Sequence, residues 1–392
     1  MTAQMRVLTF LLASAGAVAN AQEPRPNVLA GTAERLSTAF TSVDALEELR
    51  DGRVIVVDGR ERSVSIGDFA TQRVATVSRR GSGPVEYLQP RRVFRLPDGG
   101  LLVSDPANAR FLRLAPDGRE LGPWQAVNGR GRQNTMTNLS AAWDARAVDA
   151  RGRLYYELLP GPLRAGQSVS VPILRMDPDA KSVDTVAGYT MTPEMQTRVA
   201  SEGGRGVAII RSRAWPSRPE WAVAPNGTVA LVHPAPYRLS LITNGRQQDG
   251  PPVTVPPVRV TEADRSAFTD AESRVPRGPS SPAGSEPPRP AGTPPPTRKQ
   301  GGAPLFPDVM PPFSGRDAVH AAPDGRVWVS RSGHATDTVQ VIDVFGANGQ
   351  LEERIALPPR RRLLSFSESR VYLVYRDADD LEYVERYLRP RR

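Results

Sequence analysis

The sequence predicts an all-β protein and, within that class, a six-bladed β-propeller built from four-stranded antiparallel blades. The first observation is the stretch Gly81–Trp124, where alternating polar and apolar residues between Pro-Asp-Gly turns indicate a four-stranded meander. The second is that less regular copies of this unit bring the total to six. The third is the content of 39 Pro and 33 Gly, because many short strands need many turns.

Each unit is expected to hold short strands of period 2 separated by turn residues. In the first three units the expected strands are Val43–Leu49, Arg53–Asp58, Arg62–Asp68 and Arg73–Val77; Arg91–Leu96, Leu101–Ser104, Arg110–Leu114 and a closing strand to Trp124; and Asp144–Val148, Leu154–Leu158, Val171–Asp177 and Ser182–Val186. In the last three they are Glu220–Ala224, Thr228–His233, Tyr237–Thr243 and Pro252–Val255; Ala318–Ala322, Arg326–Ser330, Thr338–Phe345 and Leu351–Leu357; and Leu363–Phe366, Arg370–Tyr375 and Leu381–Leu388.

The spacing of the units supports a closed ring. Their first turns lie 47, 53, 75, 98 and 44 residues apart, at Asp51, Asp98, Arg151, Asn226, Asp324 and Glu368. Steps of about 40–50 residues are typical of propeller blades, and longer steps indicate a blade plus an insertion. The sixth unit stops after three strands, which would leave an unpaired edge, so we expect Val28–Phe40 to pair with the last blade.

The first 21 residues are predicted to be a secretory signal peptide. Arg6 precedes the apolar run Val7–Ala19, and Ala19-Asn20-Ala21 has the form of a cleavage site, so the mature chain is expected to start near Gln22. The apolar run is well short of the ~20 residues that span a bilayer. We therefore expect export to the periplasm or the extracellular space. The sequence contains no cysteine, which excludes disulfides and thiolate metal sites.

The net charge of +9 comes almost wholly from arginine, since the 51 basic residues include two lysines, Lys181 and Lys299. The arginines are scattered through every unit, and aromatic residues do not alternate with them as nucleic-acid binding would require. We therefore expect no nucleic-acid partner. A structural role on anionic envelope polymers stays open, and salt-sensitive binding would favour it.

The second unit resembles the NHL repeat of six-bladed β-propellers. The matching residues are Gly81-Ser82-Gly83-Pro84-Val85-Glu86-Tyr87, Pro90, Asp98-Gly99, Val103, Asp105, Asn108, Arg110 and Asp117-Gly118. The match is close over this unit and partial in the first and fifth. The resemblance implies the fold more than an activity, because the family includes binding scaffolds and a few metal-dependent enzymes. Asp105, Asn108 and Arg110 are expected to bond across their turn and fix the blade geometry.

Loop lengths indicate which face carries function. If the strands of a blade are named a to d from the axis outward, the a–b and c–d turns are tight, whereas the b–c loops and d–a crossovers are long. We call the face with the long segments the crossover face, and we expect it to bind the ligand. The long segments are 78–90, 128–142, 160–170, 188–219 and 256–316.

The longest crossover, at about 256–316, divides into three parts. Thr261 and Asp264 resemble a capping box and predict a short helix to about Arg274. Residues 276–304 contain ten prolines and no Leu, Ile, Val or Phe, so they are predicted to be disordered or polyproline-like. The apolar residues from Leu305 to Phe313 are expected to dock on the propeller. The segment is either a lid over the channel mouth or a tolerated surface insertion.

We interpret the protein as a monomeric, non-enzymatic scaffold that binds a protein, peptide or glycan, with no cofactor predicted and a channel metal ion left open. The candidate ligand-binding residues on the crossover face are Arg80, Glu86, Tyr87, Trp215, Tyr237, Phe306, Phe313 and His334. The alternative is a metal-dependent hydrolase or lactonase. It would require inner-strand residues to converge on the channel, the candidates being Asp44, Glu47, Glu48, Asp144, Glu220 and His320.

Overall fold

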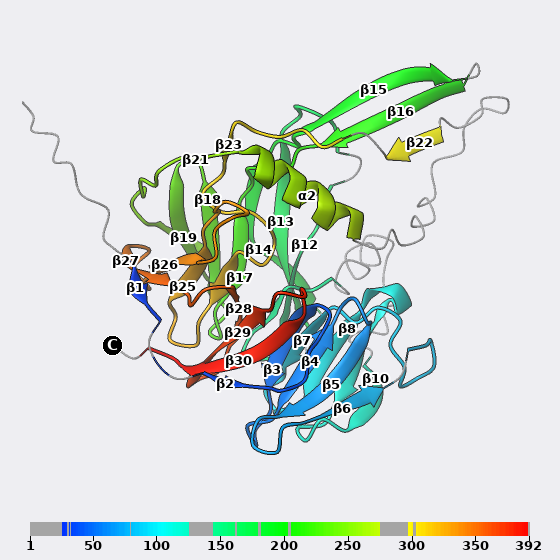
Figure 1. Ribbon diagram of the computed structural model, residues 1–392, viewed down its shortest axis with the longest axis vertical. Helices are drawn as coiled ribbons and strands as arrows, with labels where there is room; N and C mark the ends of the chain where they lie inside the picture. Colours follow the sequence, from blue (N-terminus) through cyan, green and yellow to red (C-terminus); the bar gives the residue numbers. More distant parts are fainter. Residues whose placement is uncertain are drawn as a thin grey trace, which may run out of the picture.

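The computed structural model describes residues 26–29, 31, 33–78, 80–124, 144–160, 163–178, 182–202, 205–274, 297–300 and 303–390. The predicted signal peptide lies outside these ranges. The described residues form six blades of four antiparallel strands in a ring (Figure 1). The all-β, six-bladed prediction is confirmed.

Blades 1 to 3 are continuous in sequence and follow the predicted units. Their strands are β3 (Val43–Glu48), β4 (Val54–Asp58), β5 (Ser63–Asp68) and β6 (Arg73–Ser78); β7 (Arg92–Arg95), β8 (Leu101–Asp105), β9 (Arg110–Leu114) and β10 (Glu120–Trp124); and β11 (Ala147–Val148), β12 (Leu154–Glu157), β13 (Val169–Asp177) and β14 (Ser182–Met191). The tight a–b turns form as the sequence predicts, because Gly52 and Gly99 adopt φ of +85°, which glycine tolerates.

Blades 4 to 6 complete the ring. Their strands are β17 (Glu220–Val223), β18 (Val229–Pro234), β19 (Tyr237–Thr243) and β20 (Arg246–Asp249); β24 (Val319–Ala321), β25 (Val327–Ser330), β26 (Val341–Phe345) and β27 (Leu351–Ala356); and β28 (Arg361–Phe366), β29 (Arg370–Arg376) and β30 (Glu382–Leu388). One prediction is wrong here: the outer strand of blade 4 is β20, directly after the Asn244-Gly245 turn, and not 252–255. The two-residue turn lets pairing resume at once.

The N-terminal residues supply the outer strand that blade 6 lacks. β2 (Glu34–Arg35) pairs antiparallel with β30, and the backbone of Phe40 forms an isolated antiparallel β-bridge with Glu382. β1 (Asn27–Val28) instead pairs in parallel with β27 of blade 5. The prediction that the whole of Val28–Phe40 joins the last blade is therefore right for its second half and wrong for its start, because the leader is long enough to cross two blades.

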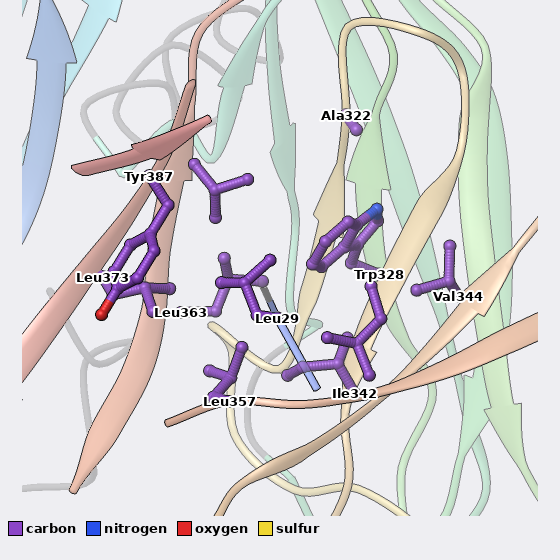
Figure 2. Close-up of a cluster of buried hydrophobic side chains, with 11 residues drawn as sticks. Leu29, Ala322, Trp328, Ile342, Val344, Leu357, Leu363, Leu373 and Tyr387 are labelled. Atoms are coloured by element: carbon purple, nitrogen blue, oxygen red, sulfur yellow. The ribbon is translucent and has the colours of Figure 1, made fainter. Parts of the chain in front are cut away.

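Among the residues that the structure describes, the hydrophobic core consists of six clusters, each between two neighbouring blades. Leu29 packs with Trp328, Leu357 and Leu363 between blades 5 and 6, as Figure 2 shows. Leu36 packs between blades 6 and 1. The leader thus contributes buried side chains to the two clusters that close the ring.

Three features extend from the crossover face. The segment predicted as an irregular crossover contains a hairpin, β15 (Met195–Glu202) and β16 (Arg205–Ser212), which projects away from the blades in Figure 1. β22 (Thr297–Gln300) pairs in parallel with β16. β21 (Val258–Arg259) pairs with β23 (Val309–Met310).

The predicted helix is present as α2 (Glu262–Arg274). The predicted disordered segment lies largely outside the described residues, but its residues 297–300 form β22, where no proline interrupts the backbone donors. Among the described residues, no helix is long and apolar enough to cross a membrane.

Candidate functional site

A cavity of about 1690 Å³ runs through the centre of the ring. Residues of the inner strand of every blade line it, from Gln89 at the crossover face to Pro97 at the opposite face. Among the described residues, ten arginines and ten aspartates or glutamates line this channel. The lining is therefore highly charged but balanced in sign.

Arg146 is the centre of a buried ionic network between blades 3, 4 and 5. Its side chain is 4% exposed and donates to Glu220 at 2.8 Å and to Glu157 at 3.4 Å. It also donates to the backbone carbonyl oxygen of Arg316 at 2.8 Å, and its guanidinium carbon lies 4.6 Å from the ring centre of Trp221. These contacts fix the guanidinium against three different segments of the chain.

The two acidic partners of Arg146, Glu157 and Glu220, each accept hydrogen bonds from several donors. Glu157 accepts hydrogen bonds from the Trp221 indole at 3.0 Å and the Tyr189 hydroxyl at 2.9 Å. Burial alone would raise the pKa of Glu157, but Arg146 and its other donors outweigh burial and hold this pKa below its usual value. Arg218 pairs with Glu220 at 2.7 Å and lies 3.7 Å from Glu157, so each buried carboxylate has at least two arginine partners.

A second ion pair crosses the channel between opposite blades. Arg92 of β7, in blade 2, donates a hydrogen bond at 2.8 Å to Asp317, which lies just before β24 of blade 5. The Asp317 carbonyl oxygen lies 2.8 Å from Nε2 of His320, whose pKa is lowered by burial. A neutral His320 that donates this hydrogen bond is the protonation state that fits both observations.

Blade 1 contributes two carboxyl groups to the same channel. Burial raises the pKa of Glu47 to about 7, although Arg95 lies 3.4 Å from it. Burial also raises the pKa of Asp44, which accepts a hydrogen bond from the Ser42 hydroxyl at 2.9 Å. Gly59 makes room for this carboxylate, since a Cβ at Gly59 would lie 1.8 Å from Asp44 Oδ2.

Five of the six residues named for a hydrolase site line the channel, namely Asp44, Glu47, Glu48, Asp144 and His320, whereas Glu220 is buried behind Arg146 and Arg218. Arginines pair with three of the six: Arg95 with Glu47, Arg316 with Asp144, and both Arg146 and Arg218 with Glu220. Within the described part of the chain, no three His, Cys, Asp or Glu side chains lie close enough together to hold a metal ion.

None of the eight residues predicted for the crossover face lines the channel. Tyr87 (1% exposed), Phe313 and Tyr237 are core residues, and the Tyr237 hydroxyl donates to Asp343 at 2.8 Å. Their side chains fill the spaces between blades, which is the usual fate of aromatic residues beside inner strands. Arg80 is exposed, and its backbone forms an isolated parallel β-bridge with Tyr87. Glu86 accepts a hydrogen bond from the Gly83 amide at 2.8 Å.

The remaining three predicted residues support α2. Trp215 and Phe306 pack against Phe268 of this helix, with ring centres 5.0 and 5.9 Å from it. His334 lies 3.0 Å from Asp264 in the first turn of the helix. The helix contributes Ala267, Asp270 and Ala271 to the channel lining, so it lies at the crossover mouth of the channel.

Asp264 is the anchor of α2. Its buried carboxylate accepts hydrogen bonds from the Thr261 amide at 2.8 Å and from the Ala335 amide at 2.6 Å. Burial would raise the pKa of Asp264, but these amides and His334 outweigh it and hold the pKa well below its usual range. Contact with Asp264 raises the pKa of His334. The predicted capping box is therefore also a link to blade 5.

This link predicts a pH dependence. A raised histidine pKa means that the stabilising contact is fully present below the unfolded-state pKa, about 6.5, and is lost as the pH rises through the folded-state value. Asp264 stays charged throughout this window. Amide exchange in α2, corrected for intrinsic rates, should therefore be slower at pH 5.5 than at pH 8. The difference should vanish in His334→Ala and persist in His233→Ala, whose ring faces Ser240 instead; its persistence in His334→Ala would contradict this account.

Sequence reasoning missed the arginines that pair with carboxylates in or behind the channel wall, which include Arg92, Arg146, Arg218, Arg316 and Arg362. With arginines in every unit, no local signal separates these from solvent-exposed ones. The β15–β16 hairpin could have been predicted from the sequence, because Gly203-Gly204 separates two runs of residues that favour strands. The predicted contacts among Asp105, Asn108 and Arg110 are present: Asn108 donates to Asp105 at 2.7 Å, and Arg110 lies 3.8 Å from it.

No protein-family model matches this chain, and no curated protein sequence matches it. Solved structures do match. A protein from Bacteroides fragilis described as exported shares 10% identity over 92% of this chain and 95% of its own, with a TM-score of 0.48. The calcium-binding protein regucalcin from Agrobacterium tumefaciens shares 12% identity over 94% and 98%, with a TM-score of 0.43.

Virginiamycin B lyase from Staphylococcus aureus shares 9% identity over 91% of this chain and 99% of its own, with a TM-score of 0.41. Such low identities and scores carry no argument about function. The class that the fold and the site define is a six-bladed β-propeller with a charged, sign-balanced channel, and this rests on the strand order and the channel lining.

Proposed function

We propose that this protein is a non-enzymatic binding protein that takes a polar ligand into its central channel from the crossover face. The observation that carries the proposal is the channel itself, about 1690 Å³ in volume with ten arginines and ten acidic residues in its lining. Small-molecule pockets are usually about 300–1,000 Å³. The larger volume suits a short peptide or an oligosaccharide.

The lining favours binding over metal-assisted hydrolysis. Channel carboxylates such as Glu47 and Asp144 already have arginine partners, which compete with a cation for the same oxygens. We therefore propose that ligand binding requires no metal ion. The proposal also includes export through residues 1–21, a monomeric state, and descent of the blade from an NHL-type repeat, for which the Gly81–Gly118 motif is the support.

The test uses one variant that fills the channel and one that does not. Ser365 of β28 lines the channel, so Ser365→Trp should place an indole in the ligand's space. The control is Thr76→Trp on the exposed outer strand β6. Native mass spectrometry with a mixture of tripeptides and oligosaccharides of three sugars measures retention on the mature chain.

We expect the wild type and Thr76→Trp to retain a common ligand, and Ser365→Trp to bind it at least tenfold more weakly. The ligand should be recovered chemically unchanged, and EDTA should not alter its affinity. Equal binding by Ser365→Trp would place the site elsewhere. Recovery of a cleaved ligand, or loss of binding in EDTA, would favour the metal-dependent hydrolase.

A further inference from the structure

We propose that the crossover mouth of the channel recognises a zwitterion, a ligand that carries a carboxylate and an ammonium group a few bonds apart, as in an amino acid or a short peptide with free ends. The binding groups are Arg92 and Arg362 for the carboxylate and Asp44 and Asp317 for the ammonium. This inference rests on the proposed function and specifies the ligand class of that channel.

The four groups come from four blades and face one part of the channel. Arg92 and Asp317 are in contact across it, at 2.8 Å. Arg362 donates to the backbone carbonyl oxygen of Val43 at 2.6 Å, which places its guanidinium beside the neighbouring Asp44. The charges of Arg362 and Asp317 both act on Asp44. Those of Asp317, Arg92 and Arg362 act on His320, so the two pairs lie within electrostatic range of one another.

These side chains are accessible. Asp317 is 68% exposed and Arg362 is 42% exposed, whereas the side chain of Arg146 is only 4% exposed. Arg362 uses Nη2 for its contacts with Glu382 and Val43. Its Nη1 and Nε have no hydrogen-bond partner among the described residues, and a guanidinium with spare donors matches a carboxylate in a bidentate manner.

Charge balance selects the ligand class. The Arg92 and Arg362 guanidinium groups face the carboxylates of Asp44 and Asp317 beside a neutral histidine, and Glu382 is the further partner of Arg362. An anion would therefore be repelled by Asp44 and Asp317, and a cation by Arg92 and Arg362. A ligand with both charges can satisfy both pairs. The cost of admitting it is small, because the Arg92–Asp317 pair that it must open is solvent-exposed, and such pairs contribute little.

Gly59 provides a way to perturb the site without removing a charge. The Asp44 carboxylate occupies the space in which a Cβ of residue 59 would lie. The φ angle of Gly59 is not positive, so alanine is compatible with the backbone there. Gly59→Ala should therefore displace the Asp44 carboxylate and weaken ammonium binding while every charge in the channel remains.

The experiment uses the mature chain and three probes: a mixture of tripeptides with free ends, the same mixture N-acetylated and C-amidated, and maltotriose. The variants are Arg92→Gln, Gly59→Ala and the control Arg175→Gln. Arg175 pairs with Asp184 at 3.1 Å on the outer strands of blade 3, with exposure similar to that of Arg92, and does not line the channel.

We expect the free tripeptides to bind, blocking of the ends to weaken binding at least tenfold, and Arg92→Gln and Gly59→Ala to weaken it similarly. Arg175→Gln should bind like the wild type. Equal binding of free and blocked peptides would overturn the inference. Binding of maltotriose alone would also overturn the inference. The proposed channel function would still hold in that case if Ser365→Trp abolishes the binding of maltotriose. If no probe binds, both proposals fail.

Discussion

Replacement of Arg146 by methionine is expected to lower the free energy of unfolding by about 3–5 kcal/mol, the usual cost of leaving a buried charge without its partner. The guanidinium is the shared partner of Glu157 and Glu220, both nearly inaccessible to solvent. We expect the lower end of the range, because Arg218 and Arg316 remain within 3.7 Å of these carboxylates. Urea unfolding followed by tryptophan fluorescence measures the change.

The control for this measurement is Arg175→Met. The Arg175–Asp184 pair is solvent-exposed on the outer strands, and exposed pairs contribute about 0–1 kcal/mol. A loss below about 1 kcal/mol in Arg146→Met, no larger than in the control, would mean that the network is dispensable for stability. Burial of these charges would then have to serve ligand binding, because burial of charged groups is costly and the network would not be stabilising the fold.

Leu36→Ala is expected to destabilise the protein by about 2–5 kcal/mol, as large-to-small substitutions in a core do. Leu36 is fully buried between blades 6 and 1, against residues that include Tyr372 and Val54. Its Cδ1 would lie 2.7 Å from a Cβ at Gly67, so the side chain occupies a space that glycine leaves open. The substitution leaves a cavity at the closure of the ring.

Val28→Ala is the matched control for Leu36→Ala. Val28 belongs to the same N-terminal leader, but it is 70% exposed. Thermal melting and urea unfolding of both variants should show a large loss for Leu36→Ala and a change within about 0.5 kcal/mol for Val28→Ala. Equal losses would mean that the leader stabilises the ring through its backbone pairing and not through burial of Leu36.

Much of the fold could be predicted because its signals are local. Alternation with period 2 and turns such as Asp98-Gly99 reflect the conformational preferences of neighbouring residues, so each hairpin can be recognised by itself. The spacing of the units then gave the number of blades. Because the sixth unit has three strands of its own, the leader was expected to pair with the last blade, but nothing indicated that its first residues would pair with blade 5.

The candidate site was less predictable, because a channel is formed by residues that are far apart in sequence. Arg92 and Asp317 are 225 positions apart and in contact, and Arg316 contacts Asp144 across 172 positions. The aromatic residues chosen from the crossover loops were reasonable candidates by type. Tyr87 and Tyr237 became core residues, since the spaces between blades offered more apolar contact than the surface did.

By itself the sequence determined the all-β class, the six units, their tight turns and the capped helix at Thr261, since strand alternation, turn chemistry and helix capping depend on residues a few positions apart. The tertiary structure alone decided which arginines are buried beside carboxylates and which face the channel. The physical reason is that charge pairing depends on distance in space, and ring closure brings together residues whose separation along the chain carries no signal of their contact.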